Sequence, residues 1–267
     1  EAVHAAGAFV YCDGANFNAI VGRVRPGDLG VDAMHINLHK TFSTPHGGGG
    51  PGSGPVVLSE ALAPFAPLPF VEQQGDAFHL VEEETAGEHH AQSFGRMTAF
   101  HGQMGMYTRA LAYILSHGAD GLRQVAEDAV LNANYILRSL DDVLEAPFGG
   151  TGPCMHEALF SDAGLADGFS TMDIAKALID EGYHPMTMYF PLVVHGAMLI
   201  EPTETESRAA LDQFIGALRS VALRAKEGDS ALKAAPHFAP RRRLDETLAA
   251  RKPVLVWKEP EQAVAAE

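Results

Sequence analysis

Three short apolar runs, separated by residues that favour turns, occupy the first 60 residues of the chain. They lie at 7–13 (GAFVYCD), 33–38 (AMHINL) and 54–59 (GPVVLS). Runs of this length, rich in β-branched or aromatic residues and close to glycine or proline, predict β-strands. Three prolines between 61 and 70 exclude a regular helix there, and the polar, acidic stretch 71–93 predicts a long surface loop.

The hydrophobic pattern changes to helical spacing beyond residue 95. Apolar residues three and four apart predict two long helices, with Gly118 ending the first. Further on, the pattern predicts a strand, a helix capped by Thr171, one or two strands with a break at Gly196, and a last helix. The predicted helices are 96–118, 121–143, 172–182 and 206–228, and the predicted strands lie within 153–162 and 190–201. Strands that alternate with helices indicate an α/β fold.

A glycine-rich loop directly follows a lysine at the end of the second predicted strand. The segment reads HINLHKTFSTPHGGGGPGSGP, residues 35–55. A dinucleotide-binding fingerprint should stand between a strand and a helix, whereas this loop precedes a predicted strand. A P-loop has its glycines before its lysine, and here Lys40 comes first. The sequence therefore argues against both phosphate-binding motifs.

Asp13 ends the first predicted strand, and Lys40 ends the second one 27 positions later. This separation allows one crossover between parallel strands, whose carboxyl ends form the crevice where such sheets bind ligands. Pyridoxal 5′-phosphate (PLP) needs a lysine amine to form an imine and an acid beside its pyridine nitrogen. The pair favours a PLP site over the alternatives, a solvated lysine and a turn-forming aspartate.

Charge and cysteine content limit the partners and the compartment. The 19 basic and 34 acidic residues give a formal net charge of −15. An acidic surface disfavours nucleic acid and anionic membranes as partners. Two cysteines, Cys12 and Cys154, are too few for a disulfide framework and indicate a reducing compartment, which we take to be the cytoplasm.

Other features argue against a membrane, a secretory leader and a metal. No apolar run reaches the roughly 18 residues that a membrane span requires. The first residues, EAVHAAGAFVYCD, lack a basic leader. The histidines show no recognised zinc spacing, so we expect no metal site.

Several stretches resemble a known family, the P-protein of the glycine cleavage system, a PLP-dependent glycine decarboxylase. The resemblance is to subunit 2 of its split bacterial form, in that subunit's C-terminal portion. It covers almost the whole chain and is carried by YCDGANFNAI, by the lysine–polyglycine segment 35–55, by LNANYILRSL, by IEPTETES and by RRRLDETLAARKPVLVW. It implies the PLP-dependent transferase fold of type I, the aspartate aminotransferase-like arrangement.

That fold implies three parts in this chain. Residues 1–118 would form the C-terminal part of the PLP-binding large domain together with a linking helix. Residues 119–232 would form a small C-terminal α/β domain, and 233–267 an extended tail. The resemblance also implies that upstream residues cradle the phosphate and stack on the ring, so this chain alone is expected to bind PLP weakly or not at all.

The resemblance assigns roles to six residues. Lys40 matches the lysine that holds PLP covalently as an imine, and Asp13 matches the partner of the pyridine nitrogen. By comparison with the wider class-V aminotransferase pattern, the other four would surround the cofactor. Ala15 would pack under the ring, Asn16 would bind its 3′-oxygen, His39 would contact the phosphate, and Asn37 stands where that pattern has serine.

The implied reaction is that of glycine dehydrogenase (aminomethyl-transferring). Glycine is decarboxylated, and its aminomethyl group passes to the lipoyl arm of H-protein, with subunit 1 as partner in a heterotetramer. Two alternatives remain: a non-catalytic assembly fragment of that subunit, or another class-V-like PLP enzyme such as a cysteine desulfurase or aminotransferase. A desulfurase needs a cysteine on a mobile loop, whereas Cys12 lies in a predicted strand and Cys154 near the start of another.

Overall fold

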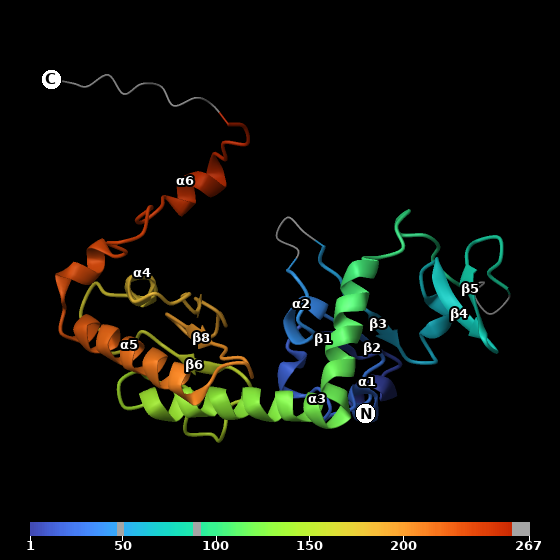
Figure 1. Cartoon of the computed structure of the whole chain (residues 1–267), viewed down its shortest axis with the longest axis horizontal. Coiled ribbons are helices and arrows are strands. Elements are labelled where there is room, and N and C mark those ends of the chain that lie inside the picture. Colours follow the sequence, from blue (N-terminus) through green and yellow to red (C-terminus); the bar gives the residue numbers. More distant parts are fainter. Residues whose placement is uncertain (47–50, 88–91, 258–267) are drawn as a thin grey trace. The chain divides into compact units, whose positions relative to one another are not determined.

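The computed structural model describes residues 1–46, 51–87 and 92–257 (Figure 1). The chain forms two compact units, which we call the first and second unit. The first unit contains Glu1–Tyr135, Cys154–Glu157 and Pro202–Ser207, and the second contains the intervening and following segments. The kink at Gly118, where we place the end of the large-domain part, lies inside the first unit.

A three-stranded sheet forms the centre of the first unit. After a short helix, α1 (Ala2–Ala5), strand β1 (Tyr11–Gly14) lies parallel to β2 (Ala33–Ile36), and β3 (Val56–Leu58) runs antiparallel to β2. The prediction of two neighbouring parallel strands joined by one crossover is confirmed. The crossover consists of two short 3-10 turns, η1 (Phe17–Ala19) and η2 (Pro26–Leu29).

The second strand ends earlier than the sequence predicts. Asn37 is extended and caps a four-residue helix, α2 (Leu38–Thr41), so Lys40 lies in the first helical turn after the strand and not at its last position. The apolar run 33–38 does not reveal this boundary. Leu38 continues the apolar pattern of the strand, but it belongs to α2 and packs against the core.

The prediction of a surface loop over 71–93 is wrong for its first half. Strands β4 (Phe70–Gln74) and β5 (Ala77–Val81) form an antiparallel hairpin that turns at Gly75, which has φ +62°. Most of β5 is exposed on both faces, so the segment lacks the apolar–polar alternation that identifies a half-buried strand. Between the two sheets lies a proline-rich stretch with one 3-10 turn, η3 (Ala63–Phe65).

Helix α3 (Met104–Leu140) contains both long helices predicted from the sequence. Gly118 interrupts it with φ 63° and ψ −174°, values outside the helical region, and Figure 1 shows the sharp bend. The predicted break at this glycine is confirmed, although the first helix starts eight residues later than its apolar pattern, at Met104 and not at Arg96. Glycine permits this left-handed φ without the penalty that a Cβ would bring.

The second unit places a small antiparallel sheet beside helices. Its strands are β6 (Ala158–Phe160), β8 (Met198–Ile200) and β7 (Thr187–Met188), in that order. The helices are α4 (Thr171–Asp180), α5 (Arg208–Lys226) and α6 (Glu246–Arg251), with a 3-10 turn η5 (Ser230–Ala234). The core side chains that are fully buried include Phe160, Met198, Ile174, Leu178 and Leu218, each worth about 1.5–3 kcal/mol of burial.

Helix α4 begins one residue earlier than predicted, at the residue expected to be its cap. Ser170 is the N-cap, and its backbone N–H donates to Oδ2 of Asp173 at 3.0 Å. Thr171 is instead the first helical residue, fully buried, and its hydroxyl donates to the carbonyl of Gly196 at 2.6 Å. The threonine therefore links the helix to the residue where the predicted strand breaks.

Asp173 links the start of α4 to the residues that follow α5. Its side chain is 1% exposed, with Lys233 Nζ at 2.7 Å from Oδ2 and Arg243 Nη2 at 2.8 Å from Oδ1. Burial alone would raise the pKa of Asp173, but the hydrogen bonds from Lys233, Arg243 and the Ser170 backbone outweigh it and hold the pKa below its ordinary value.

Across the described ranges, no helix is both long enough and apolar enough to cross a membrane.

Asp173→Asn should lower the free energy of unfolding of the second unit by about 2–4 kcal/mol, because two cations lose their buried carboxylate. A lowered folded-state pKa makes the carboxylate's contribution complete above about pH 4, the ordinary aspartate value, and lost as the pH falls below it. The difference between variant and parent in urea unfolding, followed by circular dichroism, should therefore shrink at pH 3. The exposed Asp167→Asn is the matched control and should stay within about 0.5 kcal/mol. Equal stability of parent and Asp173→Asn at pH 7 would contradict this account.

Candidate active site

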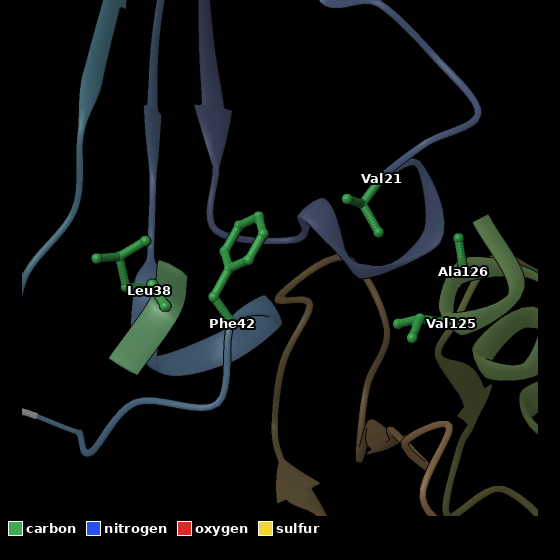
Figure 2. Packing of buried hydrophobic residues seen from close by; sticks show 6 residues of the cluster. Val21, Leu38, Phe42, Val125 and Ala126 are labelled. Atoms are coloured by element: carbon green, nitrogen blue, oxygen red, sulfur yellow. The ribbon is translucent and has the colours of Figure 1, made fainter. Parts of the chain in front are cut away.

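Helix α2, which carries Lys40, is held in place by its apolar residues. Leu38 and Phe42 lie four residues apart, so they share one face of the turn. Both are more than nine-tenths buried, and they belong to a cluster with Val21, Val125 and Ala126 (Figure 2). Because this face is turned to the core, the Lys40 side chain between them is left exposed.

A buried hydrogen bond joins α2 to the turn that follows β1. Thr41 Oγ1 donates to Oδ1 of Asn18 at 2.6 Å, and both side chains are more than nine-tenths buried. The rings of Phe17 and Phe42 lie beside this bond, with centroids 6.3 Å apart. The turn after Asp13 and the turn containing Lys40 therefore form one packed structure at the carboxyl ends of β1 and β2.

The Asp13 carboxylate is fixed through one of its oxygens. Oδ1 accepts the backbone N–H of Ala15 at 2.9 Å and lies 3.0 Å from Nε2 of His35. His35 stands opposite Asp13 in the register of β1 and β2, and its Nδ1 is hydrogen-bonded to the hydroxyl of Tyr11. Oδ2 of Asp13 takes no hydrogen bond from the part of the chain that the structure describes, and the side chain is 69% exposed.

The Lys40 amine makes no hydrogen bond or ion pair with any described residue. Its charge acts on two histidines. Burial first, then the neighbouring His46 and Lys40, lowers the pKa of His39, and burial together with Lys40 lowers the pKa of His156. Both shifts favour the neutral form of the imidazoles next to this lysine.

Two buried polar atoms near Lys40 lack a partner. Nδ1 of His39 and Oγ1 of Thr44 are inaccessible to solvent and form no hydrogen bond within the described ranges. The His39 ring makes an edge contact with His46, with centroids 4.7 Å apart. Buried polar groups in folded proteins are nearly always hydrogen-bonded, so two orphans in one turn indicate that a ligand or another part of the protein completes them.

The remaining predicted site residues lie in the same two turns. The side-chain amide of Asn16 donates to Oε2 of Glu157 at 3.1 Å, while Ala15 packs in the turn with its N–H on Asp13. Asn37 is the N-cap of α2, without a side-chain capping bond. The structure thus places Asp13 near the end of β1 and Ala15 and Asn16 in the turn after it, and it places Asn37, His39 and Lys40 in the turn after β2. Their roles toward a cofactor stay predictions.

Sequence reasoning missed His35, Thr44 and His156. His35 and Thr44 flank the lysine motif, and only the strand register and the burial of individual atoms reveal them. His156 lies 116 positions from Lys40, and its short segment, Cys154–Glu157, belongs to the first unit although the residues on either side of it belong to the second. No local pattern in the sequence could have identified such a contact.

The glycines next to β2 permit a very close approach of the backbone. A Cβ at Gly14 would lie 1.9 Å from the carbonyl oxygen of His35, and a Cβ at Gly54 would lie 2.1 Å from that of Ile36. Both close approaches are between main chains, and the loop glycines at 47–50 lie outside the described residues.

This group of residues fits PLP. PLP requires an amine, a carboxylate with a free oxygen and polar donors for its phosphate. Lys40 offers the amine and Oδ2 of Asp13 the free oxygen. The two orphaned atoms, on His39 and Thr44, are suitable donors for an anionic group.

Comparison with known proteins identifies the family. Residues 125–237 match the model of the family described as glycine dehydrogenase, C-terminal domain. The chain is 72% identical over 258 residues to the probable glycine dehydrogenase (decarboxylating) subunit 2 of Caulobacter vibrioides, covering 96% of this chain and 49% of that protein. This chain belongs to the glycine dehydrogenase subunit 2 family. The subunit 2 of Thermotoga maritima is 48% identical over 260 residues, covering 97% of this chain and 53% of that relative.

The chain spans about half the length of these subunit 2 relatives. Among solved structures, a glycine decarboxylase (P-protein) of the glycine cleavage system in inhibitor-bound form aligns with a TM-score of 0.66 at 24% identity, over 83% of this chain and 50% of that one. A cysteine desulfurase from Thermococcus onnurineus NA1 aligns with a TM-score of 0.57 at 16% identity, over 81% and 53%. These alignments confirm the predicted PLP-dependent transferase fold of type I.

Thr41→Val should lower the free energy of unfolding of the first unit by about 1–3 kcal/mol, because Asn18 loses a buried donor. Thr108→Val is the matched control. Its hydroxyl donates to the carbonyl of Met104 on the exposed surface of α3, so its loss should change stability by no more than about 0.5 kcal/mol. Urea unfolding followed by circular dichroism measures both. Equal effects of the two substitutions would show that apolar packing alone holds α2.

Proposed function

We propose that this chain provides the lysine-bearing part of a PLP-dependent glycine dehydrogenase (aminomethyl-transferring). The reaction decarboxylates glycine and transfers its aminomethyl group to the lipoyl arm of H-protein. The observation that carries this proposal is a pair of groups on adjacent parallel strands: an Asp13 carboxylate with one free oxygen near the end of β1, and the unpartnered Lys40 amine in the helical turn that follows β2. The names of the subunit 2 relatives support it.

PLP, when bound, supplies a ring that withdraws the electron pair left behind as carbon dioxide departs from glycine. Lys40 would hold it covalently through Nζ, and the same nitrogen would be available to hold a proton at that position. Oδ2 of Asp13 would accept the hydrogen bond of a protonated pyridine nitrogen and thereby favour its positive charge.

The other residues of the two turns would orient the cofactor. Ala15 would pack under the ring, and Asn16, already fixed by Glu157, would donate to its 3′-oxygen. His39 has a neutral imidazole and an orphaned Nδ1, and would donate from it to the phosphate, with Asn37 nearby at the cap of α2. The remainder of the phosphate site and the surface that stacks on the ring would come from outside this chain.

The proposed partners follow from the family. The word subunit in the relatives' names supports a partner subunit 1, in a heterotetramer, and the reaction requires glycine and lipoylated H-protein. Neither cysteine forms a disulfide bond, which supports a reducing compartment, and we propose the cytoplasm.

Lys40→Ala, in the intact protein with its partner subunit and H-protein, should abolish exchange of labelled bicarbonate into the glycine carboxyl group, since the cofactor loses its attachment and the displacing amine is gone. Unfolding should shift by no more than about 0.5–1 kcal/mol, because the side chain is exposed. The exposed Lys252→Ala is the control and should keep normal exchange. Normal exchange in a folded Lys40→Ala protein would favour the alternative of a non-catalytic assembly fragment.

Asp13→Asn should leave PLP attached, so that its visible absorption band persists, while bicarbonate exchange falls by at least about a hundredfold. A neutral amide does not hold the ring nitrogen protonated, and the ring then withdraws electrons less well. Asp28→Asn, an exposed substitution in η2 of the same crossover, is the control. Near-normal exchange in Asp13→Asn would reduce Asp13 to a residue that shapes the turn through its bond to Ala15.

A further inference from the structure

We infer that His35 is a positioning residue that orients the Asp13 carboxylate toward the cofactor ring, and that Tyr11 supports His35 in the tautomer that donates to Asp13. This inference rests on the proposed function of Asp13. It starts from the strand register, in which His35 of β2 stands opposite Asp13 of β1, with Tyr11 two residues earlier on the same face of β1.

The three side chains form a continuous hydrogen-bonded chain. The Tyr11 hydroxyl is bonded to Nδ1 of His35, and Nε2 of His35 lies 3.0 Å from Oδ1 of Asp13. The rings of Tyr11 and His35 stack with centroids 5.9 Å apart and an interplanar angle of 23°. The imidazole is therefore held by both its nitrogens and by one face.

The direction of these bonds follows from the chemistry of the groups. An ionised carboxylate can only accept, so Nε2 of His35 carries the hydrogen that points to Asp13. In the neutral imidazole, Nδ1 then has no hydrogen and accepts one from the hydroxyl of Tyr11. The carboxylate thus fixes the tautomer of His35, and the Tyr11 hydroxyl stabilises that tautomer by donating to Nδ1.

The consequence for Asp13 is a restricted carboxylate on an exposed residue. A side chain that is 69% exposed would otherwise sample several rotamers. With Oδ1 held by His35 and by the N–H of Ala15, rotation of the carboxylate would break two bonds at once. Oδ2 then remains in one position, available to a ring nitrogen, and binding costs less conformational entropy.

The test compares His35→Phe with His35→Gln in the intact protein with its partner subunit. Phenylalanine keeps a ring to stack on Tyr11 but cannot donate, whereas glutamine places an amide donor near the position of Nε2. The dissociation constant for PLP, from fluorescence titration, should rise at least about tenfold in His35→Phe, the loss expected for a hydrogen bond to a charged group. His35→Gln should restore most of the lost affinity for PLP, and Tyr11→Phe should raise the dissociation constant less, by about two- to fivefold.

The absorption band of bound PLP gives a second measurement that does not depend on turnover. We expect the wavelength or the relative intensity of this band to change in His35→Phe and to return to the parent value in His35→Gln. Thermal unfolding of each variant reports folding, and if His35→Phe does not fold, Tyr11→Phe and His35→Gln still carry the comparison. Equal losses in His35→Phe and His35→Gln would mean that the ring merely packs, and would overturn the inference.

A double-mutant cycle separates this inference from the proposed function. If His35 acts through Asp13, His35→Phe should have almost no further effect on PLP affinity in an Asp13→Ala background. An undiminished effect in that background would overturn the positioning role while leaving Lys40 and Asp13 in place. If Lys40→Ala and Asp13→Ala both leave PLP affinity unchanged, the proposed function fails, and the inference fails with it.

Discussion

The buried hydrogen bond between Thr41 and Asn18 is the constraint on which the geometry of the candidate site depends. Helix α2 has only four residues and cannot be stable in isolation, because helix nucleation is unfavourable and a single turn gains few bonds. Its position is therefore imposed from outside, by this bond and by the packing of Leu38 and Phe42. The position of Lys40 is therefore set by residues on either side of it, and the exposed lysine side chain does not contribute to the packing.

The charge distribution around Lys40 follows from the same packing. His39 and His156 are close enough to the amine and buried enough for their pKa values to fall, so neither imidazole adds positive charge at pH 7. Tyr113, which makes an edge contact with Phe42, shows the same effect of burial on an acid. Its pKa is raised to about 12 by burial and by Glu204, which accepts its hydroxyl at 3.2 Å.

Local signals in the sequence were sufficient for the framework of the fold. Turn residues and apolar runs predicted β1, β2 and the parallel crossover, and Gly118 marked the break in α3 because only glycine adopts that backbone conformation readily. The hairpin of β4 and β5 was missed because its exposed strands carry no alternating pattern. The sequence also pointed to Asp13 and Lys40, since each stands next to a strand end. His35 and Thr44 could not be found in this way, because their significance depends on strand register and on the burial of a single atom, which no local composition encodes.

The glycines on either side of β2 have a consequence for how this protein can change. Gly14 from one neighbouring strand and Gly54 from the segment leading into the other press against consecutive carbonyl oxygens of β2, at 1.9 and 2.1 Å from where a Cβ would lie. If the neighbouring atom belonged to a side chain, that side chain could adopt another rotamer to make room for a Cβ. A main-chain oxygen within a sheet has no such freedom. Neither glycine can therefore be replaced without a structural cost, and the reason is the same for both. A side chain at either position would push the neighbouring backbone away from β2, and so disturb the strands that position Asp13 and the turn containing Lys40. Substitutions that keep the fold of this region are therefore expected at other positions, where the close approach of the backbone to β2 is preserved.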